Sequence, residues 1–76
     1  MEYIIVKASE EQTQYKVMIN GEENGVTGSK IILGDSGFVN IAVPDRCSEE
    51  KTVNVENTTI SHPMIIELCK EVSWRN

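Results

Sequence analysis

The sequence predicts an all-β fold, a small antiparallel β-sandwich of about six strands. Apolar and polar residues alternate with a period of two in residues 15–19 and again in residues 38–43. Such alternation is typical of a strand that buries one face. Glycine-bearing turns at residues 20–28 and 34–37 separate the strand-like segments. Alternation bounded by turns of this kind indicates a half-buried antiparallel sheet.

The chain length allows one domain, residues 1–76. A chain of 76 residues buries only about 60% of its unfolded surface, so its core is thin. The composition, with 39% hydrophobic and 25% charged residues, is typical of globular proteins. Two packed layers that each contribute alternate residues fit this length. Residues 69–76 are expected to form a frayed tail.

Six segments carry the strand pattern. They are residues 3–8, 15–19, 30–33, 38–43, 52–56 and a C-terminal segment that ends at Leu68. The consecutive Ile31, Ile32 and Leu33 indicate burial on both faces of their strand. Pro44 ends the fourth segment, because proline cannot donate to a ladder.

A break in register separates the last two segments. Val53 and Val55 are expected to point inward, and the next inward candidate, Ile60, breaks their odd-number register. A β-bulge, or a crossing from one sheet to the other, near Asn57 and Thr58 would explain the break.

The C-terminal segment has two readings. As a strand it places Met64, Ile66 and Leu68 on one face, whereas as a helix it forms a stripe of Met64, Ile65, Leu68 and Val72. The strand fits the surrounding pattern better, and the helix stays an alternative because short apolar runs are ambiguous.

Cysteine usage is sparse, with Cys47 and Cys69 only. We expect two free thiols, as in a reducing cytoplasm. A single bridge is the alternative, provided that the two Cα atoms approach to about 5.5–6 Å.

Charge and hydropathy limit the partners and the compartment. The net charge is −5 and the basic residues are scattered, so the chain lacks the basic face that nucleic acids and anionic membranes require. No apolar run approaches the ~20 residues that span a bilayer. The N-terminus lacks a basic segment followed by a long apolar one, so it does not read as a signal peptide. We expect a cytoplasmic protein that binds no nucleic acid and does not insert into membranes.

No group of residues carries a catalytic pattern. Residues 34–37, Gly-Asp-Ser-Gly, are similar to the nucleophile segment of trypsin-like proteases, but the one histidine, His62, follows the serine. In that enzyme class the order is His, Asp, Ser, on a much longer chain. The segment is better explained as a tight turn in which Asp35 and Ser36 bond nearby backbone. Cys47, His62 and Cys69 are isolated, whereas zinc ligands come in closely spaced pairs. We expect no catalytic residues, no metal and no cofactor.

The central segment resembles a PEGA domain, a small β-sandwich module. Residues 25–28, Gly-Val-Thr-Gly, stand where that family has a Gly-x-Thr-Pro turn, with Gly28 in place of the proline. Residues 33–37 stand where the family has its Pro-Glu-Gly-Ala turn. The resemblance covers roughly residues 3–68. It implies a small non-catalytic sandwich of the kind appended to exported or surface proteins.

These observations predict a non-catalytic binding or protein-interaction module, with a carbohydrate- or envelope-associated accessory domain as the alternative. The means would be loops or exposed sheet edges, which can also join copies of the chain into a homo-oligomer. Tyr15 and Phe38 are expected in the core. The candidate binding residues are turn residues and one tryptophan in the tail: Asn20, Gly21, Glu22, Glu23, Asn24, Gly25, Asp35, Ser36 and Trp74.

Overall fold

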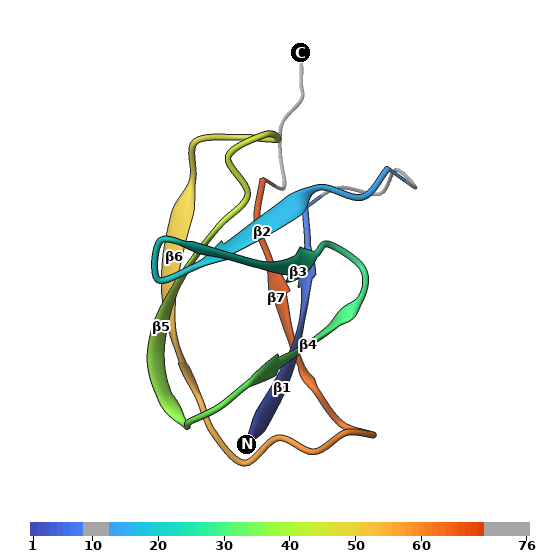
Figure 1. Cartoon of the computed structure of the whole chain (residues 1–76), viewed down its shortest axis with the longest axis vertical. Helices are drawn as coiled ribbons and strands as arrows, with labels where there is room; N and C mark the ends of the chain where they lie inside the picture. Colours follow the sequence, from blue (N-terminus) through green and yellow to red (C-terminus); the bar gives the residue numbers. More distant parts are fainter. Residues whose placement is uncertain (9–12, 70–76) are drawn as a thin grey trace.

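A computed structural model shows an all-β sandwich of two layers (Figure 1) and describes residues 1–8 and 13–69. Seven strands lie in this part of the chain: β1 (Glu2–Lys7), β2 (Lys16–Ile19), β3 (Glu22–Val26), β4 (Lys30–Leu33), β5 (Gly37–Ala42), β6 (Glu50–Val55) and β7 (Met64–Glu67). The predicted fold class is confirmed. The C-terminal segment is a strand through Glu67, and the helical alternative is wrong for its described residues. None of the described residues lies in a helix that could cross a membrane.

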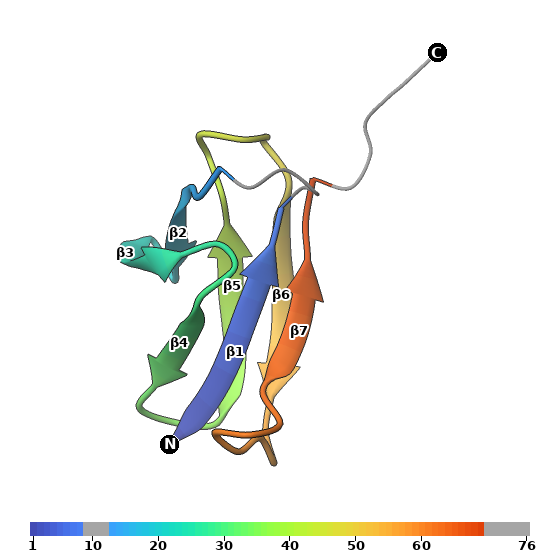
Figure 2. The same ribbon diagram turned by 90° about the vertical axis from the view of Figure 1, so that its right-hand side faces the viewer.

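The strands form a three-stranded sheet, in the order β4-β1-β7, and a four-stranded sheet, in the order β3-β2-β5-β6. Figure 2 shows the first sheet in front of β5 and β6. All pairs are antiparallel except β1 with β7, which is parallel. The prediction of a purely antiparallel sandwich is therefore wrong for this pair. Residues 56–63 carry the chain from one sheet to the other, which is the second of the two explanations given for the break in register, and β7 arrives beside β1 in the same direction.

Alternate side chains from both sheets fill the core. The inward positions are the even residues of β1 and the odd residues of β2, β4 and β5. The most deeply buried large side chains are Ile4, Val6, Val17, Ile41, Val43, Val55 and Leu68. Two-sided burial of such residues between sheets is the main source of stability in a sandwich.

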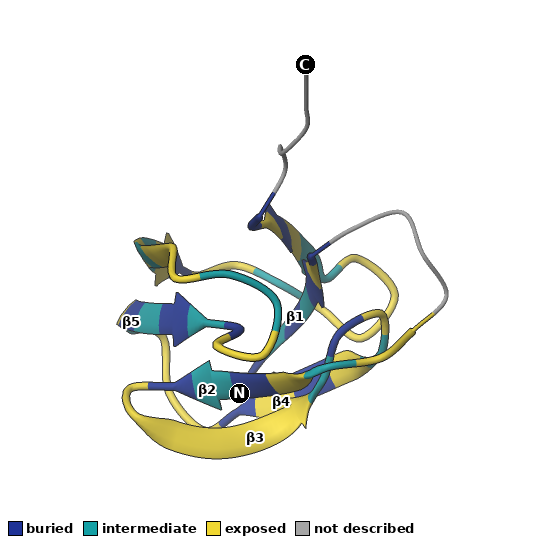
Figure 3. Ribbon diagram, turned by 90° about the horizontal axis from the view of Figure 1, so that it is seen from above, coloured by how far each residue is buried: buried dark blue, intermediate teal, exposed yellow. Residues whose placement is uncertain are grey.

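The third strand is the main element that the sequence did not predict. Residues 20–25 were expected to be a loop, but only Asn20 and Gly21 form the turn, and Ile19 pairs with Glu22. Both turn residues have positive φ, 52° and 83°, which is the geometry of a type I′ hairpin. A two-residue turn of this type returns the chain directly into the ladder, so polar residues become a strand. Their side chains are exposed, as Figure 3 shows for β3.

Three residues expected to be buried lie on the surface. Ile32 is 55% exposed, Phe38 73% and Ile60 61%. Ile32 and Phe38 occupy the outward phase of strands whose neighbours, such as Val39, point inward. Period-two alternation overrides the apolar character of a single residue. Tyr15 is half-buried and packs against the core.

A disulfide joins Cys47 and Cys69, with 5.7 Å between their Cα atoms. The expectation of free thiols is wrong, and the alternative of a single bridge is the observed state. The bridge ties the loop after β5 to the residues after β7. Beside it, the Cys69 amide donates to Glu49 Oε1 at 2.9 Å, and Lys51 Nζ donates to the Glu67 carbonyl at 2.8 Å. These links close the β6–β7 side of the sandwich.

Candidate functional site

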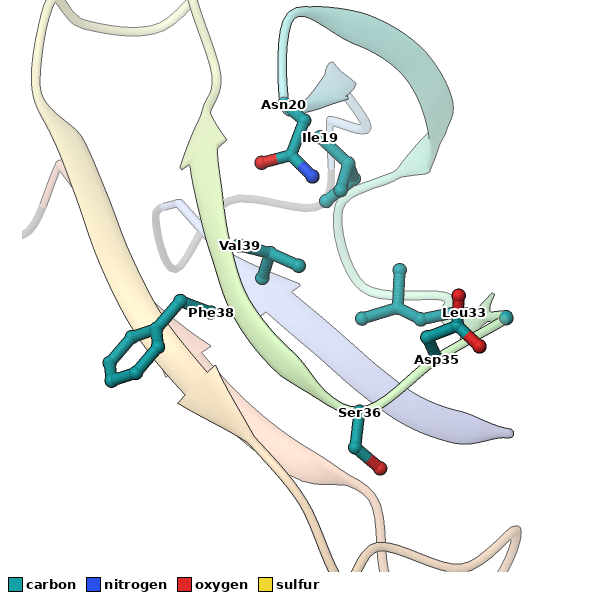
Figure 4. A pocket seen from close by; sticks show the side chains of 8 residues that line it. Ile19, Asn20, Leu33, Asp35, Ser36, Phe38 and Val39 are labelled. Atoms are coloured by element: carbon teal, nitrogen blue, oxygen red, sulfur yellow. The ribbon is translucent and has the colours of Figure 1, made fainter.

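A shallow pocket of about 260 Å³ opens between β4 and β5. We call this pocket and its rim the seam. Its floor is apolar and consists of Ile19, Leu33 and Val39, whose side chains point toward one another in Figure 4. Its rim carries Asn20 from the β2–β3 turn and Asp35 from the β4–β5 turn. The seam therefore combines an exposed part of the core with polar groups from two separate turns.

The structure brings together three of the predicted binding residues. Asn20, Asp35 and Ser36 all line the seam, although they come from turns that the sequence does not place side by side. The other predicted residues of the first turn, Gly21, Glu22, Glu23, Asn24 and Gly25, lie exposed along the hairpin and β3, and none of them lines the pocket. Trp74 lies outside the described residues.

Asn20 ends the pairing between β2 and β5. Its backbone amide donates to the Asn40 carbonyl at 2.8 Å, and its side-chain Oδ1 accepts from the Asn40 amide at 2.9 Å. Asparagine often bonds backbone in this way where a chain turns. The result is that β2 leaves β5 at Asn40, directly above the pocket.

A carboxylate at the foot of the seam was missed by sequence reasoning. Glu2 is only 6% exposed. Its Oε2 accepts from the Ser36 hydroxyl, and its Oε1 accepts from the Thr58 hydroxyl and from the Thr58 amide at 2.9 Å. The Thr58 hydroxyl also accepts from the Tyr3 amide at 2.8 Å. The signal for Glu2 was available, because its phase along β1 is that of the buried Ile4.

Hydrogen bonds from Ser36 and Thr58 lower the pKa of Glu2 from 4.5 to about 2. Each of these donors stabilises the ionised form. A general base works best with a pKa near the working pH, so this carboxylate is a poor acceptor for a serine proton at neutral pH. The sequence predicted that Ser36 bonds nearby backbone. Instead, its hydroxyl donates to Glu2 and links the β4–β5 turn to β1. The cluster positions the turn below the seam.

Metal ligation gains no support from the described residues. They contain no group of three or more His, Cys, Asp or Glu side chains that could hold an ion. The two cysteines are bonded to each other, and His62 lies exposed in the turn that its amide closes with Thr59.

A second candidate surface is the outward side of the sheet β4-β1-β7, which we call the outer face. Its apolar part consists of Tyr3, Ile5, Ile32 and Ile65, because Tyr3 lies opposite Ile32 and Ile5 lies opposite Ile65. Lys30, which lies opposite Ile5 on β4, borders this part. Ile32 is 55% and Ile65 48% exposed. The outward side of a two-layer sandwich is normally polar. In the other sheet this side carries Asn54 beside the exposed ring of Phe38. The apolar runs within β1, β4 and β7 are the sequence signal of this second apolar face.

The chain matches no protein-family model, no curated protein and no solved structure. The resemblance to PEGA domains therefore stays a prediction. In the described part of the chain, the outer face and the seam are the two surfaces that can carry a function.

Proposed function

We propose that this protein is a non-catalytic interaction module that docks onto another protein through the outer face. The observation that supports the proposal is the contiguous apolar surface of Tyr3, Ile5, Ile32 and Ile65. Contiguous apolar patches on small proteins mark interaction sites, whereas scattered apolar residues do not. Here the four side chains are cross-strand neighbours, so they form one patch.

The energetics favour docking on this face. Fully burying one isoleucine side chain contributes about 1.5–3 kcal/mol, and the outer face offers two that are about half exposed. Lys7 and Glu67 lie opposite each other at the end of the same face and supply a charged rim. An apolar centre with a polar rim is the usual organisation of a protein interface.

The test compares lysine substitutions on the two sheets. Ile32→Lys combined with Ile65→Lys places two charges on the outer face. Thr52→Lys combined with Asn54→Lys is the matched control on the outward side of the other sheet. Cross-linking in the native lysate should join the wild type and the control to the same discrete partner and should lose that product with the outer-face variant. Equal products from all three folded proteins would refute the proposal.

An envelope- or carbohydrate-associated accessory domain is the second candidate, and the disulfide between Cys47 and Cys69 favours it. Disulfides persist in oxidising compartments and are rare in the cytosol, and the PEGA resemblance implies an exported setting. The expected cytoplasmic location does not account for this disulfide. The oxidation state of the two cysteines in intact cells decides between these locations.

A further inference from the structure

β2 covers only one half of the edge of β5. It pairs with Ile41 and Ala42, and Asn20 bonds the next residue, Asn40, before the chain turns away into β3. β5 begins three residues earlier, at Gly37. Its first half therefore has a neighbouring strand on the β6 side alone.

The free half of this edge presents backbone groups toward the seam. The amide and the carbonyl of Asn40 both bond Asn20, so they point away from β6. In an antiparallel ladder, residues two apart on one strand direct their backbone groups to the same side. Phe38 therefore points its N–H and C=O away from β6, into the space that β2 has left. No hydrogen bond from another described residue meets them there.

The pocket beside this edge suits one side chain of an added strand. Its volume, about 260 Å³, lies below the roughly 300–1,000 Å³ of small-molecule sites. A strand paired with β5 alternates its side chains between the two faces of the sheet. One side chain would enter the pocket over Leu33 and Val39, and the next would lie outside, beside the exposed ring of Phe38. Figure 4 shows that ring on the opposite side of β5 from Val39.

We infer that the seam accepts an extended segment of another protein, which adds as a strand to the free half of β5. Strand addition is an established mode of recognition in which backbone bonds supply affinity and pockets supply specificity. The segment would place an aliphatic side chain in the pocket. This inference uses different residues from the outer face and stands whether or not that face binds a partner.

Charge indicates the chemistry of the segment. Asp35 is the one charged residue among those that line the pocket, and the chain carries a net charge of −5. A strand that alternates aliphatic with basic residues complements this net charge, and its basic side chains lie on the outer side of β5, where a cation beside the Phe38 ring is favoured. A second copy of this acidic chain would meet repulsion instead.

The test uses a blocked peptide of about six alternating valine and lysine residues, a usual strand length, titrated into isotope-labelled protein. Amide shifts should concentrate at Phe38 and the pocket residues, and exchange of the Phe38 amide should slow at least about tenfold on binding. The same peptide with N-methylated amides should not bind, because it cannot complete a ladder.

Two proline variants give a matched comparison. Phe38→Pro removes the amide that faces the seam, whereas Asn54→Pro removes the opposite amide of the same residue pair, which faces the free edge of β6. Proline is tolerated where the amide points away from the sheet. Phe38→Pro should weaken the peptide about tenfold, the effect of one lost hydrogen bond, and Asn54→Pro should not. Asp35→Lys, at an exposed turn, should also weaken it and leaves the ladder intact.

Three outcomes would overturn the inference. Shifts confined to the edges of β3 or β6 would place strand addition elsewhere. If the peptide binds both proline variants and Asp35→Lys as tightly as it binds the wild type, the seam is not the binding site. Shifts at Phe38 that depend on protein concentration without peptide would make a second copy of the chain the occupant.

Discussion

The carboxylate of Glu2 is the residue whose environment departs most from what its type suggests. It is buried, ionised and bonded by Ser36 and Thr58, and these bonds hold its pKa at about 2 instead of 4.5. A carboxyl group with a lowered pKa in the folded state stabilises that state above the unfolded pKa. The contribution is lost as the pH falls toward the folded pKa. The affected window is therefore from about 4.5 down to about 2.

Glu2→Gln should change this pH dependence. The amide is neutral at every pH, so its bonds to Ser36 and Thr58 are weaker than charge-assisted ones. We expect the variant to be less stable than the wild type at neutral pH, and the difference to shrink as the pH falls from 4.5 toward 2. Urea unfolding at several pH values measures this. Glu23→Gln, on exposed β3, is the control. Parallel plots of the free energy of unfolding against pH for Glu2→Gln and wild type would show that ionisation of Glu2 contributes nothing to stability.

At the scale of the element, strands with clear alternation could be predicted from the sequence. Which strands pair with each other in the sheets could not. The phase of Val39 and Ile41 fixes the inward side of β5 and points Phe38 outward. The expectation of Phe38 in the core gave more weight to its aromatic ring than to this phase and was wrong. β3 escaped prediction because its residues are polar and its strand character comes from the turn. The parallel pairing of β1 with β7 joins segments far apart in the sequence, and periodicity carries no information about such pairs.

The candidate site follows the same division. Asn20 and Asp35 could be selected as turn residues, because loops on a rigid scaffold carry function. Their meeting at one pocket depends on where β2 leaves β5, which is a feature of tertiary pairing. The outer face could not be predicted, because its residues form one surface only through the register between β4, β1 and β7.

Gly25 tests how tightly β3 packs on the other sheet. The ladder between β2 and β3 shifts register beside it, and Gly25 has a φ of +79°. A Cβ there would lie 2.7 Å from Ile31 Cγ1. Gly25→Ala should cost about 1 kcal/mol for the left-handed backbone and about 1–3 kcal/mol more for overpacking against Ile31.

Gly28→Ala separates the two costs. Gly28 has nearly the same φ, +82°, and a Cβ there meets no atom within 4 Å. It should lose only the backbone cost, about 1 kcal/mol. Urea unfolding gives both values, and equal losses for the two variants would mean that Ile31 moves aside freely.

For the whole molecule, the bridge between Cys47 and Cys69 connects stability with location. It closes a loop across 22 residues of sequence, and a loop of that length contributes about 3 kcal/mol by constraining the unfolded chain. Such a contribution is large for a domain with a thin core. A reductant should therefore lower the free energy of unfolding by about this amount, and a variant with both cysteines replaced by alanine should not respond to it.

The same bridge predicts where the protein works. Alkylating intact cells before lysis blocks free thiols and leaves bonded ones for a second label after reduction. In an oxidising compartment, both cysteines should take only the second label, because the disulfide persists there. Both should take the first label if the protein resides in a reducing cytosol. That result would exclude the envelope-associated candidate and would show that the disulfide is absent in the cell. The outer face and the seam could then still bind a cytosolic partner.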